Sequence, residues 1–152
     1  MRREDLREEI EIEVERMRRT IEELSSLVAK LPGSELGVVE KTAAGAFLAQ
    51  LYSGVENTLK RICQYQGFPL PEGPQWHDEL FRRFTEAGKA GLPMLFDHEL
   101  AQDLDVYRRF RHVFTHAYGI DLDWDRMREG AMRAPEVFDR VFAAVRDYVA
   151  EI

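Results

Sequence analysis

The sequence predicts an all-α protein, built as an up-and-down bundle of four to five main helices. Apolar residues recur at spacings of three and four over long stretches, which is typical of helices that bury one face. Clusters of proline and glycine separate these stretches, and no segment shows the clear alternation of a strand. We expect residues 1–152 to form one helical domain, because this length is close to the usual size of a single domain.

The first two helices are expected from long apolar rows. The first row is Leu6, Ile10, Val14, Met17, Ile21, Leu24, Val28 and Leu31. Pro32 should end this helix, and Ser34 should cap a second helix over about residues 35–66. In the second helix, Gly45 and Gly54 indicate close packing against a neighbouring helix.

Later boundaries are predicted by turn and cap residues. Residues 67–74 contain three prolines and two glycines, which should end the second helix. A short third helix should follow over about residues 75–87. Asp97 should cap a fourth helix that ends at Tyr118, with Gly119 in the left-handed conformation. A brief helical turn should then lead into a last helix that has Pro135 in its first turn and ends near Ile152.

Composition excludes several classes of protein. The net charge is −7, the wrong sign for a protein that binds long nucleic acid through its overall charge. Cys63 is the single cysteine, so disulfides within the chain and multi-cysteine zinc sites are excluded. No segment has the length and apolarity of a membrane span or a signal peptide, so we expect a cytoplasmic protein.

The fourth helix carries a local basic segment. Residues 106–120 contain no acidic residue. On a helical wheel, one arc should face the core: Val106, Phe110, Val113, Phe114 and Ala117. The opposite arc holds Arg108, Arg111, His112, Thr115, His116 and Tyr118. We therefore expect two imidazoles and two guanidiniums on one exposed ridge, with no carboxylate beside them.

This combination suits phosphodiester chemistry. An imidazole can accept or donate a proton near neutral pH, and a guanidinium can hold a phosphate by two hydrogen bonds. RNA supplies its own nucleophile, the 2'-hydroxyl, so neither a metal nor another cofactor is required. The same residues also fit a solvated helix face without a function. A zinc site at His112 and His116 is disfavoured, because no third ligand lies nearby in the sequence.

The segment from Arg111 to Tyr118, RHVFTHAY, resembles the signature of the HepT-like toxins of the HEPN superfamily. That signature is an arginine, four residues, a histidine, any residue and a tyrosine. The match includes the polar residue after the arginine, here His112. The order of the expected helices also fits a HEPN-like bundle over the whole chain.

The resemblance implies a metal-independent endoribonuclease that acts as a homodimer, with the motifs of two subunits facing each other. Arg111 and His116 would be the catalytic pair. In our own hypothesis, Arg108 and His112 assist in placing RNA, with Thr115 as a further auxiliary residue. Tyr118 would be adenylylated by a partner nucleotidyltransferase, an MntA-like antitoxin. From the residues alone, packing of Tyr118 against the bundle is the favoured interpretation.

A second hypothesis keeps the fold without catalysis. The chain would then be a helical module that binds a nucleotidyltransferase partner or a nucleotide, and its acidic total charge favours this alternative. Glu56 and Asn57 of the second helix could support the motif from inside the bundle, although a structural hydrogen bond or simple exposure is the commoner role for such residues.

Overall fold

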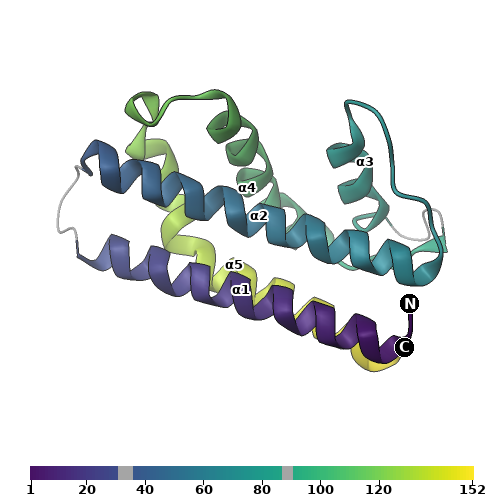
Figure 1. Ribbon diagram of the computed structural model, residues 1–152. Helices are drawn as coiled ribbons and strands as arrows, with labels where there is room; N and C mark the ends of the chain where they lie inside the picture. Colours follow the sequence, from purple (N-terminus) through teal and green to yellow (C-terminus); the bar gives the residue numbers. More distant parts are fainter. Residues whose placement is uncertain (31–35, 87–90) are drawn as a thin grey trace.

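Four long helices of alternating direction make up the body of the protein in the residues that the computed structural model describes, which are 1–30, 36–86 and 91–152. These helices are α1 (Arg3–Ala29), α2 (Val38–Gln66), α4 (His98–His116) and α5 (Trp124–Glu151). α2 packs against α1 and α4, and α5 contacts both α1 and α4 (Figure 1). The short α3 (Trp76–Arg83) and the 3-10 helix η2 (Gly119–Asp121) complete the described elements, none of which is a strand. The predicted all-α bundle is confirmed.

Close contact between helices depends on two glycines of α2. A Cβ atom on Gly54 would lie 2.6 Å from Met17 Cγ of α1, and one on Gly45 would lie 2.9 Å from the ring of Phe114 in α4. Both distances are too short for a real contact, so a glycine lets each neighbouring side chain approach the α2 backbone. The predicted packing role of Gly45 and Gly54 is confirmed.

Some of the predicted boundaries of α1, α2 and α3 can be compared with the structure. α2 ends at Gln66 as predicted, because Gly67 adopts a left-handed φ of 77° and the Phe68 N–H donates to the Cys63 carbonyl at 2.9 Å. Gly37 is the N-cap of α2. The expected roles of Pro32 and Ser34 lie outside the described residues, as does the expected end of the third helix near residue 87. α3 itself ends at Arg83, four residues earlier.

The C-terminal end of α4 differs from the prediction. Asp97 caps the helix as expected, accepting a hydrogen bond from the Leu100 N–H at 2.8 Å. The helix ends at His116, however, and Ala117 and Tyr118 are extended. Gly119 starts η2 and is not left-handed. A Cβ atom at Gly119 would collide with the Thr42 hydroxyl of α2, so close packing explains this glycine.

α5 is one continuous helix, so the prediction that Pro135 begins the last helix is wrong. The helix starts at Trp124, after Asp123 accepts a hydrogen bond from the Asp125 N–H at 3.0 Å. Pro135 lies inside it and removes one backbone hydrogen bond, a loss of about 3 kcal/mol in a helix interior. The loss is tolerated because Pro135 faces solvent while Ala131, Ala134 and Phe138 on either side of it are buried.

α4 buries a different face from the one predicted. Val106 and Val113 are about half exposed, at 50% and 51%, while Leu100, Leu104 and Tyr107 are buried. The buried row has spacings of four and three residues, and the next position in that row is Arg111. Of the arc that the helical wheel assigned to the core, Phe110, Phe114 and Ala117 are partly buried and pack against it, whereas the assignment of Val106 and Val113 is wrong. None of the helices in the described ranges is long and apolar enough to cross a membrane.

Asp103 joins α4 to α5. It accepts hydrogen bonds from Arg140 and from Arg133, the latter at 3.3 Å. The Arg140 guanidinium, helped by that of Arg133, holds the pKa of Asp103 below its ordinary value. The depressed pKa means that this carboxylate stabilises the fold above the pKa of an unfolded aspartate, and that the contribution is lost as pH falls through the folded value.

We predict that Asp103→Asn lowers the free energy of unfolding by about 1 kcal/mol at pH 7. Urea titrations should show this difference from wild type shrinking as the pH falls below about 4, the ordinary pKa of an unfolded aspartate, and disappearing once the native carboxylate is protonated as well. Asp139→Asn is the matched control, because Asp139 is exposed on α5 and should change stability very little. A difference that stays constant down to pH 2 would contradict the assigned ion pairs.

Candidate active site

A cleft of about 540 Å³ opens between α2, α3 and α4 on the side that carries the motif. It is lined by Tyr52 of α2, by Pro74, Gln75, His77 and Asp78 at the start of α3, and by Arg108, Arg109, Arg111, His112, Val113, Thr115 and His116 of α4. Five of the six residues predicted for the site therefore lie at one cleft. Tyr118 is not among its lining residues.

Glu56 lies behind the cleft as a buried carboxylate. It is 2% exposed on α2 and binds two groups from other helices. Its Oε1 lies 2.6 Å from Arg111 Nη1, and its Oε2 lies 2.5 Å from His77 Nδ1. A buried charge is costly unless it is paired and hydrogen-bonded, and here both carboxylate oxygens are engaged. The suggestion that Glu56 supports the motif from inside the bundle agrees with this geometry, whereas Asn57 lies on another side of α2.

The contacts assign the proton positions on the His77 ring. A carboxylate can only accept, so His77 Nδ1 carries the hydrogen that is donated to Glu56. Arg111 Nη1 is also 2.9 Å from this nitrogen, but it donates to Glu56 Oε1. His77 Nε2 has no hydrogen-bond partner among the described residues. The ring is held by one nitrogen and leaves the other free.

Arg111 is half-buried, with 29% of its side chain exposed, because it follows the buried row of α4. The expectation of an exposed ridge is wrong for this residue and also for Arg108, whose side chain is 27% exposed. Its Nε and Nη2 have no hydrogen-bond partner within the described parts of the chain. Arg111 can therefore keep its pair with Glu56 and still donate hydrogen bonds to a phosphate.

The expectation that no carboxylate lies beside the motif is also wrong. Arg108 pairs with Asp78 of α3 and with Asp105, and Arg109 pairs with Asp105 as well. Burial opposes ionisation of Asp105, yet the Arg108 guanidinium holds the pKa of Asp105 below its usual range. With Glu56, three carboxylates match the three arginines Arg108, Arg109 and Arg111, so this region is nearly neutral.

The two motif histidines lie on the exposed side of the cleft. His116 Nδ1 donates to the His112 carbonyl oxygen at 2.9 Å, which leaves His116 Nε2 free. The two rings have centroids 4.6 Å apart. Thr115 donates its hydroxyl to the Arg111 carbonyl at 2.7 Å, so it contributes to the helix end more than to the cleft. The described residues contain no group of three or more histidine, cysteine or carboxylate side chains that could hold a metal ion.

Tyr118 stands apart from the helix because α4 has already ended. Its side chain is 79% exposed in an extended segment before η2. The helical wheel placed Tyr118 on the same arc as Arg111, a relation that requires an intact helix through residue 118. The alternative in which Tyr118 packs against the bundle does not occur in the structure.

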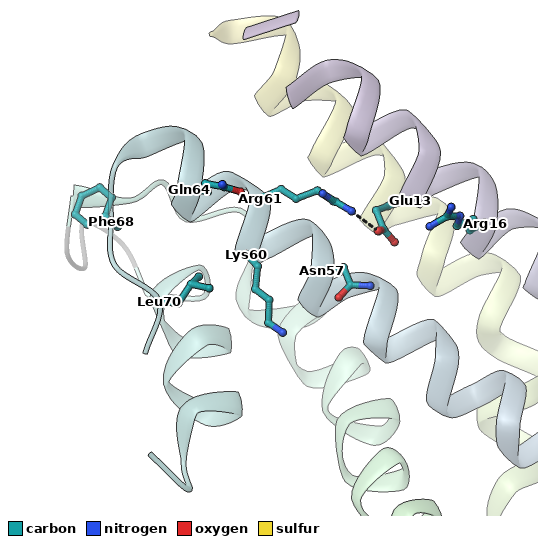
Figure 2. Close-up of a pocket in the computed structure, with 8 residues that line it drawn as sticks. All are labelled: Glu13, Arg16, Asn57, Lys60, Arg61, Gln64, Phe68 and Leu70. Carbon is teal, nitrogen blue, oxygen red and sulfur yellow. Dashed lines mark hydrogen bonds and ion pairs between the residues drawn. The ribbon is translucent and has the colours of Figure 1, made fainter. Parts of the chain in front are cut away.

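A second hollow of about 540 Å³ lies along α1 and α2, away from the motif (Figure 2). Arg61 reaches across it to Glu13 of α1 at 3.0 Å (Figure 2). Arg61 also pairs with Glu9 of α1 at 2.8 Å. Lys60, another lining residue, has its Nζ 4.3 Å from the centre of the Trp76 ring of α3. No histidine lines this hollow, so it lacks the acid–base groups of the motif cleft.

A family model described as HepT-like protein matches residues 43–152. The chain belongs to the HepT-like family. The matched region begins inside α2 and covers every residue that lines the motif cleft. Neither a curated protein nor a solved structure matches the chain.

Sequence reasoning missed His77, Asp78 and Tyr52 in this HepT-like chain. The signal for Glu56 was present, because it lies four residues after Tyr52 and three before Leu59 in a row that is otherwise buried and uncharged. A carboxylate in such a row indicates a buried partner. His77 and Asp78 lie on a helix of eight residues, too short for its spacing to show which side faces α4.

Tyr52 carries an unsatisfied hydroxyl at the cleft. The residue is 0% exposed, and its oxygen has no hydrogen-bond partner among the described residues. Burial raises the pKa of Tyr52 well above its ordinary value, and the nearby Glu56 charge acts in the same direction. The phenol therefore stays neutral and gains no hydrogen bond in return for its burial.

We predict that Tyr52→Phe leaves the free energy of unfolding unchanged or raises it by up to about 1 kcal/mol, because no hydrogen bond is lost. Tyr107→Phe is the matched comparison. Its hydroxyl is buried and donates to the Gly130 carbonyl at 2.7 Å, so its loss should cost about 1 kcal/mol. Urea titration measures both. Equal losses for the two variants would show that the Tyr52 hydroxyl has a partner.

Proposed function

We propose that this HepT-like chain is a metal-independent endoribonuclease toxin whose site is the motif cleft. The main support is that Arg111 and His116 lie at one cleft and both have free hydrogen-bonding groups. These groups are Nε and Nη2 of Arg111 and Nε2 of His116. Family membership supports the same conclusion. These are the groups that an RNA phosphodiester requires, one to hold the phosphate and one to move a proton.

In this mechanism the 2'-hydroxyl attacks the adjacent phosphorus and the 5'-oxygen leaves. Arg111 donates to the non-bridging phosphate oxygens, on which negative charge develops. His116 acts as a general acid or base through Nε2. His112 and Arg108 would help to place the RNA, with Thr115 in a supporting position. The products would be a 2',3'-cyclic phosphate and a 5'-hydroxyl.

The proposal includes a homodimer in which the two clefts face each other. Val106 and Val113 support it, because they are seven residues apart on one side of α4 and half exposed, and Val113 also lines the cleft. A second copy would cover these apolar side chains and enclose the open cleft.

A noncatalytic module that binds a nucleotidyltransferase partner or a nucleotide is the second candidate. The observation that favours it is the matching of Arg108, Arg109 and Arg111 by three carboxylates, which leaves little positive charge for RNA. Co-purification with a nucleotidyltransferase, without RNA cleavage and without growth arrest when the chain is expressed alone, would select this candidate.

We predict that purified protein cleaves RNA in excess chelator, and that His116→Ala lowers the rate at least about 100-fold by removing the proton-transfer group. Arg111→Lys should have an effect of similar size, because it keeps a positive charge beside Glu56 but loses the planar fork. Gel analysis of the cyclic-phosphate product measures both rates. His98→Ala is the control, since His98 is at the other end of α4 and bonds Gln102.

Unchanged cleavage in His116→Ala would overturn the site assignment. The same preparation should be a dimer by light scattering at working concentration. A species of only 17.7 kDa would contradict the shared site.

Adenylylation of Tyr118 is the proposed means of neutralisation. The tyrosine hydroxyl would attack the α-phosphorus of ATP on the partner MntA-like nucleotidyltransferase, forming a phosphodiester to AMP and releasing pyrophosphate. The added nucleotide would bring bulk and negative charge close to the end of α4, where RNA must bind. Among the five tyrosines, all in the described part of the chain, Tyr118 alone is exposed.

We predict that co-expression with the partner nucleotidyltransferase adds the mass of an adenylyl group, that peptide mapping locates it at Tyr118, and that RNA cleavage then falls without unfolding. Tyr118→Phe should stay unmodified, while Tyr65→Phe should be modified like wild type, because Tyr65 is partly buried on α2. A mass shift that persists in Tyr118→Phe would show that the acceptor is another residue.

A further inference from the structure

We infer that His77 is the general base of the site, although it lies outside the motif of residues 111–118. The observation is a histidine of α3 that donates one ring nitrogen to buried Glu56 and lines the same cleft as Arg111 and His116 with its other nitrogen free. This inference rests on the proposed ribonuclease function and names a second proton-transfer group for it.

The contact with Glu56 fixes the form of the ring that a base requires. With Nδ1–H donated to Glu56 Oε2 at 2.5 Å, the neutral ring carries its lone pair on Nε2. A carboxylate that orients a histidine in this way stabilises both the tautomer and the charge that forms when the ring accepts a proton. Glu56 can do so reliably because its side chain is only 3% exposed and cannot turn toward water.

Packing holds the ring on a second side. The Trp76 ring lies against His77, with centroids 3.5 Å apart and planes 31° apart. Lys60 of α2 in turn lies over Trp76. The His77 side chain remains 35% exposed, so it is positioned from two sides and still open to the cleft. Such fixed orientation with access is what distinguishes a proton-transfer group from a buried structural histidine.

The titratable and charged groups around His77 come from all three helices of the cleft. From α2 these are Glu56 and the neutral phenol of Tyr52, and α3 itself contributes Asp78. α4 contributes Arg108, Arg109, Arg111, His112 and His116. The nearest groups are Glu56 and Arg111, whose opposite charges form a pair. His77 therefore faces a paired carboxylate instead of an isolated one.

In this reaction one histidine accepts a proton and a second histidine donates one. His77 Nε2 takes the proton of the 2'-hydroxyl while that oxygen forms its bond to phosphorus. The bond from phosphorus to the 5'-oxygen breaks, and His116 Nε2 gives a proton to the leaving oxygen. No water is consumed, and one proton is gained by His77 as one is lost by His116. Arg111 holds the phosphate between them.

A purely structural role for His77 would consist of its hydrogen bond to Glu56, and one substitution separates the two roles. His77→Asn can retain an N–H near the position of Nδ1 but has no group in place of Nε2. If His77 had only a structural role, this substitution would have little effect on turnover. His98→Asn is the matched control at the far end of α4.

We expect His77→Asn to unfold at nearly the wild-type temperature, to keep its KM within about threefold, and to lose kcat at least about 100-fold. The wild-type rate should depend on pH with two limbs, and the variant should lose the acidic limb, because a base must be unprotonated to act. An RNA with sulfur at the leaving 5' position needs no acid. It should restore cleavage by His116→Ala and leave His77→Asn impaired.

The outcomes separate this inference from the proposed function. Cleavage by wild type together with full activity and both pH limbs in His77→Asn overturns the role of His77 and leaves the ribonuclease function in place. Restoration of His77→Asn, instead of His116→Ala, by the sulfur substrate also overturns the assignment of His77 as base. Wild-type protein that cleaves no RNA in chelator removes the proposed function, and this inference with it.

Discussion

A single buried carboxylate, that of Glu56, organises the site and ties it to the fold. Taking a carboxylate out of water costs several kcal/mol unless charged or hydrogen-bonding partners replace the water. Here the partners come from two other helices, Arg111 from α4 and His77 from α3. The ion pair with Arg111 and the hydrogen bond from His77 therefore hold α4 and α3 in register against α2. The same contacts set the direction of the guanidinium and imidazole that face the cleft. Loss of Glu56 would leave a half-buried arginine unpaired and would free the His77 ring.

This arrangement explains why the site is partly inside the bundle. Arg111 continues the buried row Leu100, Leu104 and Tyr107, and Phe114, the next member, packs against Gly45. The α4 helix thus passes from an apolar contact to an ionic one and back to an apolar one along one face. An arginine in that row is tolerated only because α2 presents a carboxylate opposite it. The contact between Arg111 and Glu56 therefore both stabilises the packing of α4 on α2 and positions the Arg111 side chain.

The charges at the motif cleft are nearly balanced. The arginines of the cleft are matched by Glu56, Asp78 and Asp105, in a protein of net charge −7. Long-range attraction of RNA by bulk charge would therefore be weak, so the proposed ribonuclease function requires recognition by short-range hydrogen bonds. Suitable groups are the free nitrogens of Arg111 and the exposed His112 and His116. The same matching leaves a surface near neutrality beside exposed Val106 and Val113, which is compatible with burial against another protein surface.

The sequence by itself determined the helical class, the long α1 and α2, the cap at Asp97, the end of α2 and the position of Arg111, His112 and His116 on a late helix. These features depend on residues a few positions apart, so spacing and turn chemistry are sufficient to predict them. Only the tertiary structure decided which face of α4 is buried, where α4 ends before Tyr118, and that α5 continues through Pro135. Each of these depends on what a distant helix covers or supports. The same holds for the contact of Arg111 with Glu56 and His77, because residues far apart in the chain meet only when three helices pack and a buried carboxylate requires partners.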